Sequence, residues 1–450
     1  MPGRVRTLWL NVSQSLGFIP GLITVGFAAL GIVLVEVDRG IDLSGVSWVF
    51  QGDGPAARTV LSVIAGSLIT VAGLTFSMTM VVLQLASSQF SPRVLRTFFG
   101  DRITQITIGT YVGTFVYSLL VLRAVGSYGD SGFVPRLSVT AASLLGIAAV
   151  VLLIVFLHHV SQMVQVSHVT ASIARATLAR TDALFPEPFV ADGDDDADRA
   201  VARWRAGGGG GCVRADRPGF VQRVAVDELV GALEGDVERV AVLVCPGDFV
   251  GAGEPIAELW PASAADRCAG PVQSAVAIED ERDLDQDIDF GLRQLADIAL
   301  RASSPSVNDP TTAVTAIAYM RTVLARLAER ADPPGFERSD RGVLVAVRRR
   351  RFDDHLEMLL QISRHAADDG WVTGALLQAL AACGATAARH EAHARVATIR
   401  SLAETIAEQA IAQAGSDRDR RATRERLAAV PTRSGAADPS GAGSASRSSA

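Results

Sequence analysis

Lysine is absent from all 450 residues, so every positively charged side chain is an arginine. A Walker A phosphate loop, a Schiff-base lysine and a biotinyl or lipoyl attachment site all need lysine, and the sequence therefore excludes them. Cysteine is also scarce. The four cysteines form no C-x-x-C pair and are expected to be reduced thiols of a cytoplasmic domain. They are Cys212, Cys245, Cys268 and Cys383.

The chain also lacks a basic excess, because its formal net charge is -6. No aromatic-plus-basic pattern is present, and nucleic acid is not an expected partner. No nucleophile–base pair, glycine-rich phosphate loop or metal-ligand set stands out either. We therefore expect no catalytic residue, no cofactor and no metal, and a protein that is not an enzyme.

Charge is missing altogether from Thr59 to Pro92. A helix of that length rises about 50 Å at 1.5 Å per residue, which exceeds a hydrocarbon core of about 30 Å. Apolar runs predict four membrane spans, and the first is read as a retained helix rather than a cleaved signal peptide. The predicted spans are residues 17–35, 61–85, 103–122 and 137–157.

The arginines of the connections set the expected orientation. Arg93, Arg96 and Arg102 lie between the second and third spans, and Arg4 precedes the first. By the positive-inside rule these segments are cytoplasmic. We expect a multi-pass protein of the cell (inner) membrane with both termini in the cytoplasm.

Two of the predicted spans have polar stripes at helical spacing. We expect the stripes to face each other and to supply pore-lining residues. The alternative is a purely structural role, in which the stripes pack helices together through small residues and hydroxyl groups. The pore-lining candidates are Thr70, Ser77, Gln84, Ser88, Gln89, Thr107, Tyr111 and Thr114.

After the fourth span, helical periodicity continues to Leu184, and five glycines end at Gly211. The following strands predict a small β-rich unit. Its Pro246–Ile256 segment resembles the hairpin of biotinyl/lipoyl-type barrel-sandwich domains, without the attachment lysine. Four arginines, Arg348 to Arg351, are read as a solvated strand end or as contacts to anionic lipid.

A helical domain follows an acidic run that lacks the glycine and glutamate of an EF-hand, although loose divalent binding stays open. Two of its helices meet at a corner with Asp309 as N-cap and Pro310 in the first turn. This corner either binds an anion or is satisfied by its own contacts. Its residues are Arg293, Gln294, Asp297, Arg301, Ser304, Asn308 and Asp309.

Two segments resemble a known family of bacterial predicted membrane proteins, of the domain-of-unknown-function kind. The first is Thr75–Arg93, continuing to Gly113–Tyr117, and the second is Phe290–Pro310 with its S-P-x-x-N-D-P corner. The resemblance covers about residues 17–414 and implies four membrane helices and a cytoplasmic domain. It brings no established activity. Ser303 and Ser306 depart from the residues usual in the family.

The expected fold class is a membrane α-helical domain of four transmembrane helices plus a cytoplasmic α+β domain, which contains the barrel-sandwich-like unit and a helical bundle. The leading functional hypothesis is a homo-oligomeric channel-like or transporter-like pathway for ions or small solutes, with a cytoplasmic gating or assembly domain. The alternative is a membrane-tethered sensor or scaffold that binds an anionic ligand or protein partner. The expected domains are 1–160 (transmembrane), 161–191 (helical stalk), 192–211 (linker), 212–277 (β-rich unit), 278–414 (helical domain) and 415–450 (disordered tail).

Overall fold

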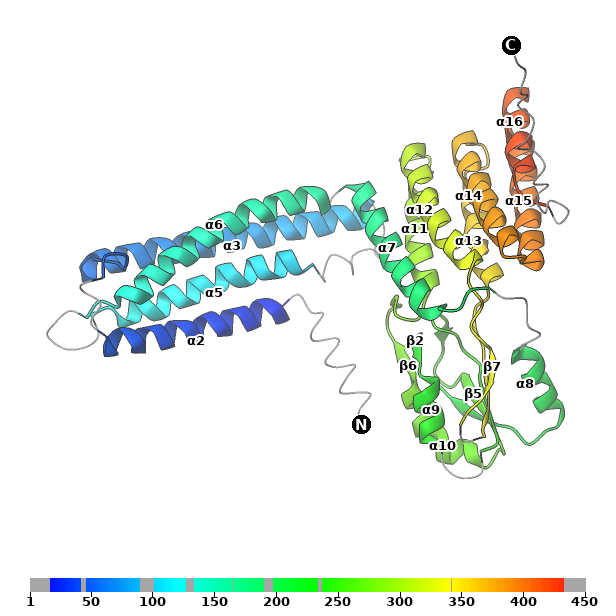
Figure 1. The fold of residues 1–450 in the computed structure, drawn as a ribbon, viewed down its shortest axis with the longest axis horizontal. Helices are drawn as coiled ribbons and strands as arrows, with labels where there is room; N and C mark the ends of the chain where they lie inside the picture. Colours follow the sequence, from blue (N-terminus) through cyan, green and yellow to red (C-terminus); the bar gives the residue numbers. More distant parts are fainter. Residues whose placement is uncertain are drawn as a thin grey trace, which may run out of the picture. The chain divides into compact units, whose positions relative to one another are not determined.

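The computed structural model describes residues 17–41, 46–89, 101–126, 133–163, 165–189, 197–233, 237–340 and 342–432. The chain divides into two compact units, residues 1–168 and 169–450, each considered by itself. Unit 1 contains four long helices (Figure 1). They are α2 (Phe18–Gly40), α3 (Gly54–Gln89), α5 (Arg102–Ala124) and α6 (Arg136–Met163).

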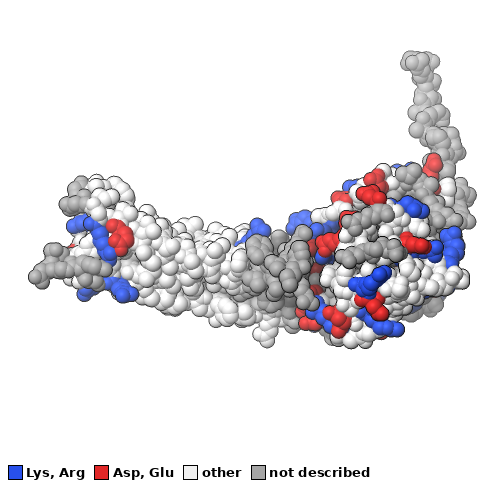
Figure 2. Space-filling view, turned by 90° about the horizontal axis from the view of Figure 1, so that it is seen from below, with Lys and Arg blue, Asp and Glu red and all other residues white. Residues whose placement is uncertain are grey.

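Five helices of the described residues are long and apolar enough to cross a membrane. Four are the helices of unit 1, whose apolar flank is free of charged side chains on the face seen in Figure 2. The fifth is α14 (Gly370–Arg389) of unit 2, and 61% of its most apolar 18-residue stretch is buried. Apolar helices thus place the protein in a bilayer, while their number alone does not fix the count of spans.

Helix α5 is the central helix of unit 1, because 50% of its apolar window is buried, against 11–28% for α2, α3 and α6. Glycines let it approach α2 closely. A Cβ on Gly109 would lie 2.8 Å from the Cα of Pro20, and one on Gly113 would lie 2.9 Å from the ring of Phe27. These distances leave no room for a larger side chain, so the glycines fix the α2–α5 contact.

Helix α3 buries a stripe with spacings of three and four residues, which points toward the other helices of unit 1. The stripe consists of Ala57, Leu61, Ala65, Leu68, Ala72, Thr75, Thr79 and Leu83. Thr70, Ser77 and Gln84 are exposed. At about 100° per residue they lie roughly 150° away from the buried stripe. The prediction that the two polar stripes face each other within the chain is therefore wrong.

Helix α7 (Val166–Leu184), most of which belongs to unit 2, is separate from α6, so the predicted stalk is not one helix with the fourth span. The expected linker contains a helix, α8 (Ala197–Ala206), and the expected disordered tail contains α16 (Asp417–Ala428). Trp204 of α8 packs edge-on against Trp260 and so holds the helix on the sheet. The predicted linker and tail were wrong over these residues.

Two antiparallel-rich sheets make up the β region of unit 2. The five-stranded sheet has the order β1-β5-β3-β8-β7, and the three-stranded sheet has the order β4-β2-β6. Their bounds are β1 (Gly211–Arg214), β2 (Gly219–Val224), β3 (Arg239–Val242), β4 (Phe249–Val250), β5 (Pro255–Trp260), β6 (Val276–Glu279), β7 (Phe336–Arg338) and β8 (Leu344–Val347).

Successive side chains of a strand point to opposite faces of a sheet, which explains how helices cover both faces of the five-stranded sheet. Val240 and Val345 pack into the core shared with α9 (Val226–Ala232) and α10 (Ala264–Ala275), whereas Ala241 packs toward α8. Strands β4 and β5 belong to different sheets, so the barrel-sandwich hairpin is not confirmed. Strand β8 pairs in parallel with β3, so the sheet crosses the predicted boundary at residue 277.

The rest of unit 2 is a helical bundle (Figure 1). Helices α14 and α15 are separated at Glu391, which has a left-handed backbone with φ 57°. The bundle helices are α11 (Ile288–Ala302), α12 (Pro310–Ala328), α13 (Phe352–His365), α14, α15 (His393–Gln413) and α16.

Candidate functional site

Five hydroxyl groups lie in the interior of unit 1, and we call this set the hydroxyl seam. Each of the five residues is 0–1% exposed, and in the described part of the chain none of these hydroxyl oxygens has a hydrogen-bond partner. A buried unpaired polar group costs about 1–3 kcal/mol. The hydroxyl seam consists of Thr75 of α3 and Thr107, Tyr111, Thr114 and Ser118 of α5.

Contacts place the hydroxyl seam where α3, α5 and α6 meet. Tyr111 packs in one cluster with Leu68 and Ala72 of α3 and Ala149 of α6. Thr79 of α3 and Thr104 of α5 line one small cavity together with Val160 and Met163 of α6. Thr75 lies between Ala72 and Thr79 on the buried stripe of α3. Since Ala72 packs with Tyr111 and Thr79 lies near Thr104, Thr75 faces the stretch of α5 between Thr104 and Tyr111, which includes Thr107.

Threonines elsewhere in unit 1 behave differently. Thr70 Oγ1 donates to the carbonyl of Gly66 at 2.9 Å, and Thr79 Oγ1 donates to that of Thr75 at 2.9 Å. This bond to the carbonyl four residues earlier is how a hydroxyl is usually satisfied inside a helix. The seam hydroxyls make no such bond in the described part of the chain, so each can still form hydrogen bonds with another polar group.

Polar contacts close both ends of this helix group. At one end the Asp101 carboxylate accepts from Thr104 Oγ1 at 2.5 Å and lies 2.9 Å from His159 Nε2. At the other end Asp38 of α2 accepts from the backbone N–H groups of Leu137 and Ser138, each at 2.9 Å. Asp38 thus caps the N-terminus of α6 from a different helix.

Three of the predicted pore-lining residues, Thr107, Tyr111 and Thr114, belong to the hydroxyl seam. Thr70, Ser77 and Gln84 lie instead on the exposed face of α3. The backbones of Ser88 and Gln89 belong to α3, while their side chains lie outside the described part of the structure. The structure therefore separates one predicted pore-lining group into an inner and an outer set.

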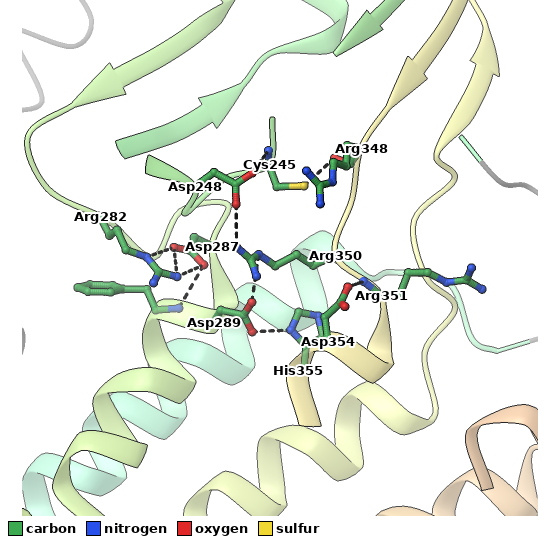
Figure 3. Close-up of polar contacts among 11 residues, drawn as sticks. Cys245, Asp248, Arg282, Asp287, Asp289, Arg348, Arg350, Arg351, Asp354 and His355 are labelled. Carbon is green, nitrogen blue, oxygen red and sulfur yellow. Dashed lines mark hydrogen bonds and ion pairs between the residues drawn. The ribbon is translucent and has the colours of Figure 1, made fainter. Parts of the chain in front are cut away.

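A second polar cluster lies in unit 2, and we call it the Asp289 network (Figure 3). Asp289 Oδ1 lies 2.5 Å from His355 Nδ1, and Asp289 Oδ2 lies 3.2 Å from Arg350 Nε. Arg350 also reaches Asp248 at 2.8 Å, in the loop between β3 and β4. The network therefore joins the three-stranded sheet region to α11 and α13.

The neighbouring Asp287 has its own arginine. Arg282 donates to Asp287 from Nε at 2.7 Å and from Nη2 at 2.9 Å. Burial raises the pKa of Asp287 above its usual range, although Arg282 opposes this shift. Burial also raises the pKa of Asp289, but the hydrogen bond and charge of His355, with Arg350 and Arg282, outweigh it and lower the pKa overall.

The acidic run thus lies against arginines and a histidine, which the sequence reading missed. Arg180 of α7 reaches Asp285 at 2.6 Å, and this pair adds to those of Asp287 and Asp289. Such pairing favours a structural role for these carboxylates over loose divalent binding. No group of three potential metal ligands occurs among the described residues. The arginine run after β8 is only partly solvated, because Arg350 is committed to the network.

The corner between α11 and α12 is satisfied by its own contacts. The Asp309 carboxylate accepts from the backbone N–H of Thr312 at 3.1 Å and from its hydroxyl at 2.6 Å. These hydrogen bonds hold the pKa of Asp309 below its usual range. Asn308 turns the chain with a left-handed φ of 48°. The carboxylate occupies the helix N-terminus that an anion would use.

The other corner residues do not converge on one point. Arg293 donates to the side chain of Gln361 on α13 at 2.7 Å, and Gln294 is buried. Arg301 is exposed, and Ser304 Oγ donates to the carbonyl of Arg301 at 2.7 Å. Asp297 is half-buried on α11. These positions favour the structural reading of the corner over an anion site.

Comparison with known proteins matches residues 13–382 to the family described as "Predicted membrane protein (DUF2254)". The chain belongs to this family. Uncharacterized proteins of Mycobacterium bovis and Mycobacterium tuberculosis are 36% identical over 342 residues. The match covers 74% of this chain and 64% of each relative, so the chain spans less than two thirds of their length. No solved structure matches the chain.

The Asp289 network predicts a pH-dependent loss of stability in Asp289→Asn. The folded pKa is lowered, so the contribution of the carboxylate is full above its usual pKa of about 4 and is lost as pH falls through the folded value. We expect the variant to be less stable at pH 7 by about 2–4 kcal/mol. Thermal unfolding of the detergent-solubilised protein should show this difference narrowing below pH 4. A difference independent of pH would contradict the assignment.

Proposed function

We propose that the protein is a channel-like or transporter-like membrane protein whose route for ions or small solutes runs along the hydroxyl seam. The observation that supports the route is the set of five buried hydroxyl groups without partners in the described residues. Helix packing alone would favour hydroxyls bonded to their own helix, as those of the exposed Thr70 and the buried Thr79 are. Polar groups that face a membrane-protein interior are typical of solute and ion pathways.

We assign the exposed stripe of α3 to assembly of a homo-oligomer. Gly66, Thr70, Gly73 and Ser77 lie on one exposed face, and apolar side chains such as Phe76 and Val81 flank it. Small residues at this spacing let two membrane helices approach closely. In this arrangement α3 contacts other copies of the chain, while its opposite face lines the route.

Four spans, with both termini in the cytoplasm of an inner-membrane protein, complete the proposal. Helix α14 is assigned to unit 2 rather than to the bilayer, because Leu376, Leu377 and Leu380 are fully buried in its bundle. Unit 2 would then gate or assemble the membrane part without catalytic chemistry. The self-satisfied corner at Asp309 does not favour the sensor alternative.

Flux through reconstituted protein tests the route. Liposomes that contain the full chain should gain permeability to at least one of H⁺, K⁺, Cl⁻ or glycerol. The larger side chain in Thr107→Leu should fill the seam and reduce that permeability about ten-fold or more, because overpacking an interior excludes water-sized guests. Ser77→Leu also introduces a leucine, but on the outer face of α3, and should alter the oligomeric mass instead.

Two results would overturn the proposal. One is permeability no greater than that of empty liposomes for all four solutes. The other is a loss of flux in Ser77→Leu with normal flux in Thr107→Leu, since this would move the route to the outer face of α3. Size-exclusion chromatography of each variant before reconstitution separates a blocked route from a misfolded protein.

A further inference from the structure

We propose that the species that moves along the hydroxyl seam is the proton, carried by a single file of water molecules between the hydroxyl groups. This inference rests on the proposed route and names what it conducts. Its first support is spacing. Thr104, Thr107, Tyr111, Thr114 and Ser118 follow each other at three- and four-residue intervals on one buried face of α5. Their axial separations are thus about 4.5 and 6 Å.

Direct hydrogen bonds between neighbouring hydroxyls need an oxygen–oxygen distance of about 2.8 Å, and the four seam hydroxyls of α5 have no such partner among the described residues. One water between each pair forms two such bonds and bridges about 5.6 Å. From Thr104 to Ser118 the file would cover about 21 Å of a hydrocarbon core of about 30 Å. Hydroxyls and waters in alternation thus fit both the spacing and the missing partners.

The narrow interior favours protons over larger species. The cavity between Thr79 and Thr104 has a volume of about 10 Å³, which is close to the space that one water requires. On α6, Ala142 and Ala149 pack in apolar clusters with side chains of α3 and α5, and a Cβ on Gly146 would lie 3.8 Å from Ile64, so the helices pack closely there. A hydrated ion needs a wider bore, whereas a proton needs only a continuous hydrogen-bonded chain.

Titratable groups stand at one end of the file. Thr104 donates to Asp101, and Asp101 contacts His159, so hydrogen bonds lead from an imidazole to the first hydroxyl. Charged groups at the opposite end include Asp38, Arg58 and Arg136. They are engaged with Ser138, the carbonyl of Val125 and the carbonyl of Phe50, respectively. The seam itself contains no charged residue.

Transfer along such a file leaves its composition unchanged. Each oxygen accepts one proton from the preceding group and releases another to the next, so every O–H bond that breaks is replaced by one that forms. Once the hydroxyl groups and waters have rotated back to their first orientation, the hydrogen-bonded file can carry another proton. No oxidant, reductant or bound cofactor takes part, and the transmembrane proton gradient or potential drives the movement.

Proton flux into liposomes tests this inference. The full chain is reconstituted with a pH-sensitive dye inside, and valinomycin with a K⁺ gradient sets the potential. Thr107→Val with Thr114→Val removes two hydroxyls at nearly constant shape. We expect proton flux to fall about ten-fold or more, because two waters lose a partner. Thr70→Val removes a hydroxyl that is bonded to its own helix on the exposed face of α3, and its proton flux should stay within about two-fold of that of the parent chain.

The outcomes separate the two proposals. Proton flux of Thr107→Val with Thr114→Val equal to that of the parent chain overturns the proton file. Seam-dependent flux of K⁺, Cl⁻ or glycerol without proton flux also overturns it, while the route along the seam stands. No flux of any kind overturns both.

Thermal unfolding in detergent gives a second readout that does not depend on transport. Hydrated hydroxyls make the Thr107→Val and Thr114→Val pair less stable than the parent chain, because the waters lose hydrogen bonds. Dry, unpaired hydroxyls make the same pair more stable, because valine has no polar group to desolvate. A rise in unfolding temperature would therefore contradict the water file even in a variant that reconstitutes poorly.

Discussion

Replacing Arg395 by methionine should destabilise unit 2 by about 3–5 kcal/mol, the usual range when one partner of a buried charged pair is removed. Arg395 is 4% exposed, and its Nη1 donates to the carbonyls of Leu327 at 3.1 Å and Arg330 at 2.6 Å. Its Nη2 lies 3.0 Å from Asp332. The substitution removes these hydrogen bonds at the end of α12 and the ion pair with the Asp332 carboxylate.

Two aromatic rings add to this expectation. The guanidinium carbon of Arg395 lies 4.7 Å from the ring centre of Phe189 and 4.8 Å from that of Phe352. Methionine retains apolar volume between the rings, so the measured loss reports mainly on charge and hydrogen bonds. Arg395→Lys should recover only part of the stability, because an ammonium lacks the planar fork.

Thermal or denaturant unfolding in detergent measures the effect of Arg395→Met. Arg364→Met on α13 is the matched control, because Arg364 is exposed. It should change stability by less than about 0.5 kcal/mol. Equal effects of the two substitutions would mean that the contacts of Arg395 do not stabilise the bundle.

Gly291→Ala should destabilise unit 2 by about 1–3 kcal/mol through overpacking. A Cβ on Gly291 would lie 2.0 Å from Thr177 Oγ1 and 3.0 Å from Thr177 Cβ. Both residues are inside helices, α11 and α7, so neither backbone can yield without shifting its helix. The glycine therefore sets how closely α7 packs against α11.

The sign of the stability change in Gly291→Ala distinguishes the steric effect of the new Cβ from the higher helix propensity of alanine. Alanine in place of glycine usually stabilises a helix by about 1 kcal/mol. Gly231→Ala on α9 is the control, because Gly231 is exposed and a Cβ there meets nothing within 4 Å. Unfolding experiments should thus give opposite signs for the two variants. Thr177→Ala should partly rescue Gly291→Ala, since it removes the nearest atom.

The sequence predicted several long apolar helices of a membrane protein, because long apolar runs have few alternatives to a span. It misjudged which face of α3 lies inside. Gly66, Thr70, Gly73 and Ser77 stand out as a polar stripe, but the buried stripe contains mostly alanine and leucine, with Thr75 and Thr79. In a membrane helix both faces are apolar enough to contact lipid. The periodicity of its polar residues therefore does not show which face points into the protein.

In unit 2, local signals predicted most helices but not the pairs formed between distant segments. The spacing of Asp285, Asp287 and Asp289 gave no indication that Arg180, Arg282 and His355 would meet them. Asp309 was predicted as an N-cap because its hydrogen bond is local. Contacts between residues about a hundred positions apart, such as that of Asp248 with Arg350, cannot be predicted until the fold is known.

The parallel pairing of β3 with β8 has a consequence for synthesis of the chain on the ribosome. Val240 finds its partner, Val345, only after α11 and α12 have been made. Until then one edge of β3 is open and can pair with the same edge of a neighbouring nascent chain. A fragment that stops at residue 277 would keep that edge open permanently, so it should aggregate rather than behave as an independent module.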